Sequence, residues 1–208
     1  MIRSLVVCLL TAAIAGSALG SGTARDTIKD TDPTYKFSVS TSAFSILNLF
    51  PDDVSIYELH VRYRITPKDV IAIEASTWKI YAPIGIPYGP HIEQKSERYP
   101  GRIRESGVGV SYQRFLWKGL FASLQVLPLW KIYLDENNKK IQEGFRLYTT
   151  YRLGYHFPLF RNRCFVEPFA DAVYWPINTN LPQSFKVMED KGPNYFLFEP
   201  GLHLGINF

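Results

Sequence analysis

Cysteine is scarce in this sequence, and its scarcity excludes a disulfide framework. The chain of 208 residues has two cysteines, Cys8 and Cys164. Cys8 lies in an apolar N-terminal segment that we expect to be removed, which leaves Cys164 alone and no intramolecular disulfide. A small exported domain without disulfides must be stabilised by a well-packed core or by a membrane.

Net charge and long apolar runs are also lacking. The 23 basic and 19 acidic residues give a formal charge of +4, too small to indicate a nucleic-acid partner. After the N-terminal segment, no apolar run approaches the roughly 20 residues that a membrane-spanning helix needs. If the protein crosses a membrane, it therefore crosses with strands.

The N-terminus has the layout of a secretory signal. Arg3 precedes an apolar run over residues 5–15, and the small residues Ala18 and Gly20 suit a cleavage site. The run is about a dozen residues long, too short for a transmembrane anchor. We predict a cleaved signal peptide at 1–20, a polar periplasmic lead at 21–33 and a single domain at 34–208.

The remaining sequence alternates between apolar and polar residues with a period of two, which is typical of strands with one buried face. Residues 56–65 are the clearest case, and residues 145–157 and 195–208 repeat the pattern. The apolar face of the first segment is Tyr57, Leu59, Val61, Tyr63 and Ile65, and its polar face is Glu58, His60, Arg62 and Arg64.

The same template predicts eight strands. They lie at roughly 35–47, 55–66, 70–81, 106–115, 119–134, 144–157, 164–175 and 195–208. Short connections at 66–69, 116–118 and 158–163 alternate with long ones at 82–105, 135–143 and 176–194, and only the connection at 48–54 departs from this order. Short turns on one side and long loops on the other are typical of outer-membrane barrels.

The apolar face is too continuous, too aromatic and too free of charge to face water over so many strands. A charged interior would also be a poor pocket for a water-soluble ligand barrel. We therefore expect an all-β fold, an eight-stranded antiparallel up-and-down transmembrane β-barrel with both termini in the periplasm. Aromatic residues near the strand ends predict two interfacial girdles, and Tyr133, Trp175 and Tyr195 belong to the outer one.

The last eight residues end in an aromatic side chain, with apolar residues at alternate positions before it: Leu204, Ile206 and Phe208. This stretch resembles the C-terminal insertion signal of small bacterial outer-membrane barrels, and the whole mature chain is similar to the OmpA membrane domain, OmpX and OmpW type. The resemblance implies insertion by the outer-membrane assembly machinery of a Gram-negative bacterium. We expect a monomer among outer-membrane lipids and lipopolysaccharide.

The predicted interior contains nearly balanced charges. Because a buried unpaired charge is costly, we interpret them as an ion-pair network that fills the barrel. A narrow polar path or ligand site is the alternative. We expect no catalytic set, no metal set and no cofactor among these residues. The predicted interior residues are Glu58, His60, Arg62, Arg64, Glu74, Arg146, Arg152, Glu167, Asp171, Glu199 and His203, with His156 besides.

Prolines within predicted strands are the least ordinary feature. Pro168 and Pro200 each follow a glutamate and lie on neighbouring strands, where a proline removes a ladder hydrogen-bond donor. They mark either bulges or a lateral opening that passes lipids or apolar molecules. A lipid A-modifying enzyme is the third hypothesis, after a non-enzymatic barrel and a barrel that binds or passes lipids. It is disfavoured because the chain lacks the His-x-Ser pair of lipid A deacylases. The basic, proline-rich loop at 82–105 is expected to contact lipopolysaccharide or another surface ligand.

Overall fold

The structure, a computed structural model, describes residues 35–43, 45, 55–83 and 98–208. All of them belong to one compact unit, Asp32–Phe208. The predicted signal peptide at 1–20, the polar lead at 21–33, the connection at 48–54 and most of the loop at 82–105 lie outside the described residues. Those expectations stay predictions.

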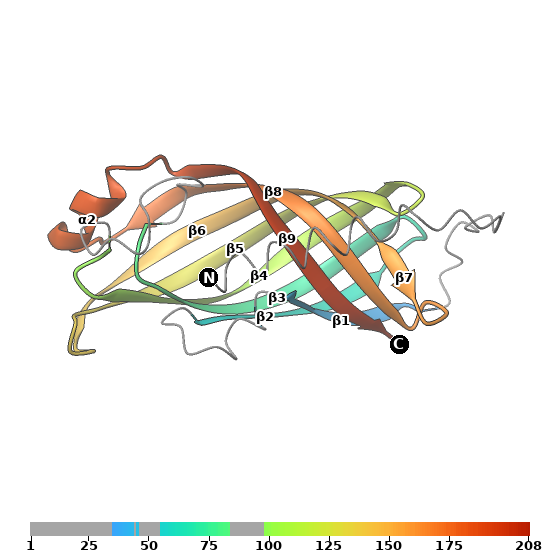
Figure 1. Cartoon of the computed structure of the whole chain (residues 1–208), viewed down its shortest axis with the longest axis horizontal. Coiled ribbons are helices and arrows are strands. Elements are labelled where there is room, and N and C mark those ends of the chain that lie inside the picture. The colour runs from blue at the N-terminus through green and yellow to red at the C-terminus, as the bar shows by residue number, and fades with distance from the viewer. Residues whose placement is uncertain (1–34, 44, 46–54, 84–97) are drawn as a thin grey trace, which may run out of the picture. The chain divides into compact units, whose positions relative to one another are not determined.

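The described residues form nine strands and one α-helix (Figure 1). They are β1 (Phe37–Ser42), β2 (Ser55–Arg64), β3 (Asp69–Ile80), β4 (Arg102–Trp117), β5 (Leu120–Leu134), β6 (Lys140–Tyr155), β7 (Phe157–Leu159), β8 (Cys164–Thr179), α2 (Gln183–Glu189) and β9 (Tyr195–Asn207). Across these residues, no helical segment has the length and apolarity that a membrane crossing requires.

The sheet is antiparallel, runs up and down, and closes into a ring of eight strands. Consecutive strands pair from β1 to β6, β6 pairs with β8, β8 with β9, and β9 returns to β1. The all-β, eight-stranded antiparallel prediction is confirmed at this level. The short strand β7 continues the line of β6 after an interruption at His156 and pairs with the beginning of β8.

Side chains alternate between the two faces of the ring as the sequence predicts. In β3, Ala72 and Glu74 are buried, whereas the alternate residues Ile71 and Ile73 are 43% and 61% exposed. Other strands repeat this, with Val110 and Leu153 exposed on the outside. The exposed outer face is therefore largely apolar, and the buried charged residues lie in the interior.

Three aromatic residues lie inside the ring, contrary to the sequence prediction. Tyr133 and Trp175 are buried because each has the same strand parity as an inward charge, Lys131 and Asp171 respectively. The alternation in 195–208 predicts Phe196 on the outer face, with Leu204 and Phe208. It points inward because of a bulge in β9, and it packs against the buried apolar cluster that includes Trp175.

The bulge in β9 lies at Phe198. Asp171 pairs with Glu199 and Ala172 with Leu197, so Phe198 has no partner in the ladder, and its φ is 71°. An extra residue reverses the alternation before it. Glu199 and His203, after the bulge, point inward as predicted. Phe196, before the bulge, points inward too because of the extra residue.

The two ends of the ring differ in their connections. At the end where Phe208 lies, β4 and β5 are joined through Lys118 and Gly119, both with positive φ, which suits a tight hairpin. At the opposite end lies α2, inside the connection from β8 to β9 (Figure 1). The sequence did not predict this helix, and the connection at 135–139 is shorter than the expected 135–143 because β6 begins at Lys140.

Candidate functional site in the ring interior

The interior nearest Phe208 contains a buried, fully paired polar cluster. Nη1 of Arg62 lies 2.8 Å from Oε2 of Glu167, and Nη2 donates to Oε1 of Gln113 at 2.7 Å. Nδ1 of His156 lies 2.8 Å from Oε1 of the same Glu167. The four side chains come from β2, β4, β8 and the break after β6, so they connect distant parts of the wall across the interior.

A second polar group, which we call the central cluster, lies farther from Phe208. In it, Arg152 forms a bidentate ion pair with Asp171, at 2.9 Å and 2.8 Å. Nδ1 of His60 lies 3.0 Å from Oε1 of Glu74, and Glu74 also accepts hydrogen bonds from Ser111 and Gln125. The central cluster comprises Glu58, His60, Glu74, Arg152, Asp171, Glu199 and His203.

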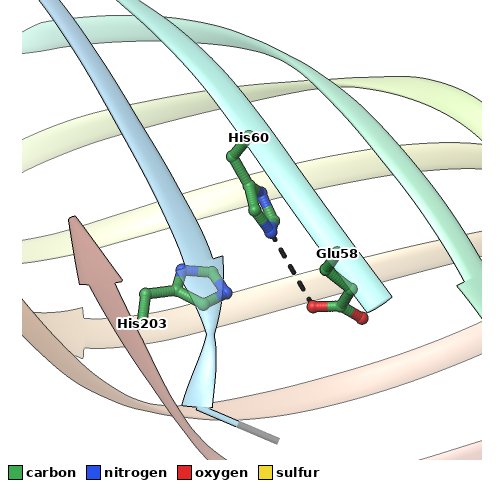
Figure 2. A group of neighbouring side chains, drawn as sticks. All are labelled: Glu58, His60 and His203. Carbon is green, nitrogen blue, oxygen red and sulfur yellow. Dashed lines mark ion pairs between the residues drawn. The ribbon is translucent and has the colours of Figure 1, made fainter. Parts of the chain in front are cut away.

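Strand β1 brings the two histidines of the central cluster together. Ser40 pairs with His60 on one side of β1, and Ser42 pairs with His203 on the other. Both serines are buried and small, so the two imidazole rings approach across the strand to 4.6 Å between centroids. Figure 2 shows Glu58 and His60 projecting from β2, with the His203 ring beside them.

Two glycines of β9 make room for phenylalanine rings of β8 around these clusters. Gly205 pairs with Phe165, and Gly201 pairs with Phe169. A Cβ atom at Gly205 would lie 2.1 Å from the Phe165 ring, and one at Gly201 would lie 2.2 Å from the Phe169 ring. The rings then serve as platforms for the guanidinium groups, Arg62 over Phe165 and Arg152 over Phe169.

An apolar cluster lies beyond the central cluster, toward α2. It consists of Trp78, Leu127, Leu129, Tyr148, Val173 and Trp175, with Ile56 and Phe196 against it. Between the two clusters is a cavity of about 170 Å³, and Glu58, Trp78, Tyr148 and Glu199 are among its lining residues. The sequence predicted a charged interior, and this layer was missed although Tyr148 was placed on the inward face, because Trp175 was assigned to a girdle and most of the other residues to no face.

The end of the ring near α2 is closed by a third charged group. Oε1 of Glu105 lies 3.6 Å from Nζ of Lys131 and 3.3 Å from Nη1 of Arg146. Nη2 of Arg146 also lies 2.9 Å from Oε1 of Glu189 at the end of α2. Phe185 and Met188 of α2 pack with Tyr99, Ile103 and Tyr133 above this group.

Tyr99 ties the helix to the connection between β3 and β4. Its hydroxyl donates a hydrogen bond to Glu189, and its ring stacks on Phe185 with 5.1 Å between centroids. Burial, together with the nearby Glu189 carboxylate, raises the pKa of Tyr99 well above its ordinary value. The phenol therefore stays protonated and keeps its donor.

The predicted interior residues are thus divided among separate groups. Arg62 and Glu167 are in the first, Arg146 is near α2, and most others are in the central cluster. Arg64 donates to the Pro67 carbonyl at 2.9 Å and lies over Phe115, and within the described residues no ion pair of Arg64 is found. Sequence reasoning missed Gln113, Glu105, Lys131 and Glu189, although the first three have inward parity.

The prolines lie where a ladder already lacks a partner. Pro168 pairs with Leu202 on one side, and on its other side lies the interruption between β6 and β7. Pro200 pairs with Ala170, and among the described residues the pairing of β1 with β9 begins at His203. Such positions tolerate a missing donor. The β8–β9 ladder runs past both prolines, and a lateral opening there stays a prediction.

The C-terminal residues lie on the outer face of β9. Ile206 and Phe208 are exposed, and Leu204 is half-buried. The Phe208 amide donates to the Phe37 carbonyl at 2.8 Å, so the last residue is held against the start of β1. Their role as an insertion signal stays a prediction.

Comparison with known proteins identifies no relative: no family model, curated protein or solved structure matches the chain. The resemblance to small outer-membrane barrels stays an expectation. Function must therefore be argued from the geometry of the ring and its interior.

Proposed function

We propose that this protein is a monomeric outer-membrane β-barrel with a closed interior, serving a structural or surface-interaction role and no enzymatic one. The observation that carries the proposal is the division of faces. Large apolar side chains such as Ile73 and Val110 are exposed around the ring, whereas Arg62, Glu74 and Glu167 are buried inside it. That division is stable in lipid and unfavourable in water.

The small size of the cavities in the interior argues against a steady ion path. The cavities beside His60 and Arg62 measure about 10 Å³ each, which is room for about one water molecule. Above them lie the cavity of about 170 Å³, the apolar cluster and then α2 with its buried side chains. On this proposal the bound partners are membrane lipids, lipopolysaccharide at the α2 end, and the assembly machinery that reads Leu204, Ile206 and Phe208.

Two measurements test the proposal. Fractionation of Gram-negative cells that express the full chain should recover it in the outer membrane, with Ser21 as its first residue by mass spectrometry. The purified protein should then give no steady conductance in a planar bilayer. Recovery in the periplasm as a soluble protein would overturn the membrane assignment, and a stable open current would overturn the closed interior.

A second candidate function is the binding of apolar molecules through the wall. Within the described residues, β2 before His60 and β9 before His203 each pair on one side only. The 170 Å³ cavity is lined by residues of both edges, Ile56 and Glu58 from β2 and Glu199 from β9. An apolar chain that passed the wall would meet Trp78 on one side of this cavity.

Quenching of tryptophan fluorescence tests this second candidate. A spin-labelled fatty acid should quench the detergent-solubilised protein saturably, and Trp78→Phe should remove the saturable part. Trp130→Phe is the matched control, because Trp130 is exposed on the outer face. Quenching that never saturates, or that is removed by Trp130→Phe instead, would contradict this second candidate. It would mean that the fatty acid only contacts the outer surface of the ring.

A further inference from the structure

We infer that the central cluster binds a divalent transition-metal cation of the Zn²⁺ class through Glu58, His60 and His203. One ligand atom from each of these three side chains lies within 4.8 Å of the other two. The inference goes beyond the proposed function and does not depend on it, because it concerns only the interior of the folded ring.

One of the three distances between the ligand atoms is already close to that of a bound site. The ligands of a tetrahedral zinc ion lie about 2.0–2.2 Å from the metal and hence about 3.3 Å from each other. Nε2 of His60 is already 3.7 Å from Oε2 of Glu58, the ion pair drawn in Figure 2. Small side-chain rotations of Glu58 and His203 would complete the set.

His60 is oriented as metal-binding histidines are. Its Nδ1 faces the Glu74 carboxylate, which fixes the ring and, in the neutral imidazole, leaves the lone pair on Nε2. That Nε2 atom is buried and has no hydrogen-bond partner among the described residues. Glu74 is held in turn by Ser111 and Gln125, so the ring has one of the supporting acceptors that metal-binding histidines usually have.

Charge also favours a cation here. Glu58 and Glu74 face His60, and Asp171 and Glu199 line the cavity beside Glu58, whereas Arg152 lies against His203 and pairs with Asp171. Arg62, the next cation, is matched by Glu167. A buried excess of acids is expensive unless it is neutralised, and a divalent ion would supply the missing positive charge.

Arg152 occupies the ring nitrogens of His203 and must move before His203 can bind a metal ion. Its Nη1 atom lies 3.3 Å from Nδ1 and 3.2 Å from Nε2 of that ring. A metal ion needs one of these nitrogens, so Arg152 must release it while keeping its bidentate pair with Asp171. The cavity beside Glu58 has room for a water molecule as the fourth ligand, which would give an open, three-residue site.

Titration of the folded full chain, processed and without an affinity tag, tests the inference in detergent micelles. One Zn²⁺ per chain should bind, and Co²⁺ should give the visible absorption band of nitrogen-ligated tetrahedral cobalt. His60→Gln and His203→Gln should each weaken Zn²⁺ binding by about tenfold or more, and Glu74→Gln should weaken it by about 10–100-fold. His156→Gln is the matched control, since His156 is equally buried but belongs to the cluster of Arg62.

The outcomes separate cleanly. No Zn²⁺ bound by the folded wild-type chain overturns the inference, as does full affinity in a folded His60→Gln/His203→Gln double variant. Far-UV circular dichroism checks each variant's fold. Where a variant does not fold, the cobalt spectrum of the wild-type chain decides, because a spectrum with oxygen ligands only would contradict histidine ligation.

Discussion

Nη1 of Arg62 and Oε2 of Glu167 lie 2.8 Å apart and join β2 to β8 across the interior of the ring. These strands are not neighbours, since β1 and β9 lie between them in the sheet. Both side chains are buried, so neither charge can be satisfied by water if the other is removed. The pair therefore fixes how the first and last thirds of the chain face each other.

Removing one partner of this pair should be strongly destabilising. We expect Arg62→Leu to lower the free energy of unfolding by about 3–5 kcal/mol, because Glu167 is left buried without its cation. The double variant Arg62→Leu/Glu167→Leu should recover much of that loss. Urea unfolding of the protein in detergent or lipid measures both.

The exposed pair of Arg114 and Asp69 is the control for that experiment. Its atoms are also 2.8 Å apart, but the Arg114 side chain is 55% exposed. Arg114→Leu should cost no more than about 1 kcal/mol. Equal losses from Arg62→Leu and Arg114→Leu would contradict the account of a buried, mutually dependent pair.

The contact between Gly205 and Phe165 gives a second prediction. Gly205→Ala should lower the free energy of unfolding by about 1–3 kcal/mol, because the new methyl group collides with a ring that is itself held under Arg62. Ala75→Val on the exposed outer face is the control and should change stability little. If Gly205→Ala is as stable as the wild type, the ring does not cover the glycine as described.

The anchoring of α2 gives a third prediction. Glu189→Gln weakens the ion pair with Arg146 and the hydrogen bond from Tyr99, so amide hydrogen exchange in Gln183–Glu189 should become faster. Lys186→Gln, which removes only the exposed pair with Asp190, should leave that exchange unchanged. Faster exchange in both variants alike would mean that the buried ion pair does not hold the helix.

The division of faces could be predicted from the sequence because it follows from a period-two pattern that local residues determine. Glu74 and Ile73 illustrate this, each found on its expected face. The ring of eight strands could be predicted from the number of such segments and from the alternation of short and long connections. Phe196 could not be assigned from the pattern, since a bulge at Phe198 reverses the alternation and depends on pairing with β8. Sequence spacing could not bring His60 to His203 either, because their proximity is created by the pairing of β1 with both neighbours.

Helix α2 was missed for a related reason. Its seven residues are too few to show a helical period, and its buried side chains Phe185 and Met188 are stabilised by contacts with Tyr99 and Tyr133 rather than by local propensity. The Glu189 carboxylate enters the interior only because that helix packs over the end of the ring. Loop residues of this kind gain their role from tertiary contacts that no local pattern reports.

Nitroxide accessibility along β3 tests the central claim, that the apolar face of this ring lies in lipid. Spin labels placed singly at 71, 72, 73 and 75 in a Cys164→Ser background would be measured in vesicles by electron paramagnetic resonance. Labels replacing Ile71, Ile73 and Ala75 should be reached by oxygen dissolved in lipid and shielded from a water-soluble nickel reagent, whereas the label replacing Ala72 should be reached by neither. Greater accessibility of Ile71 and Ile73 to the nickel reagent than to oxygen would contradict the account.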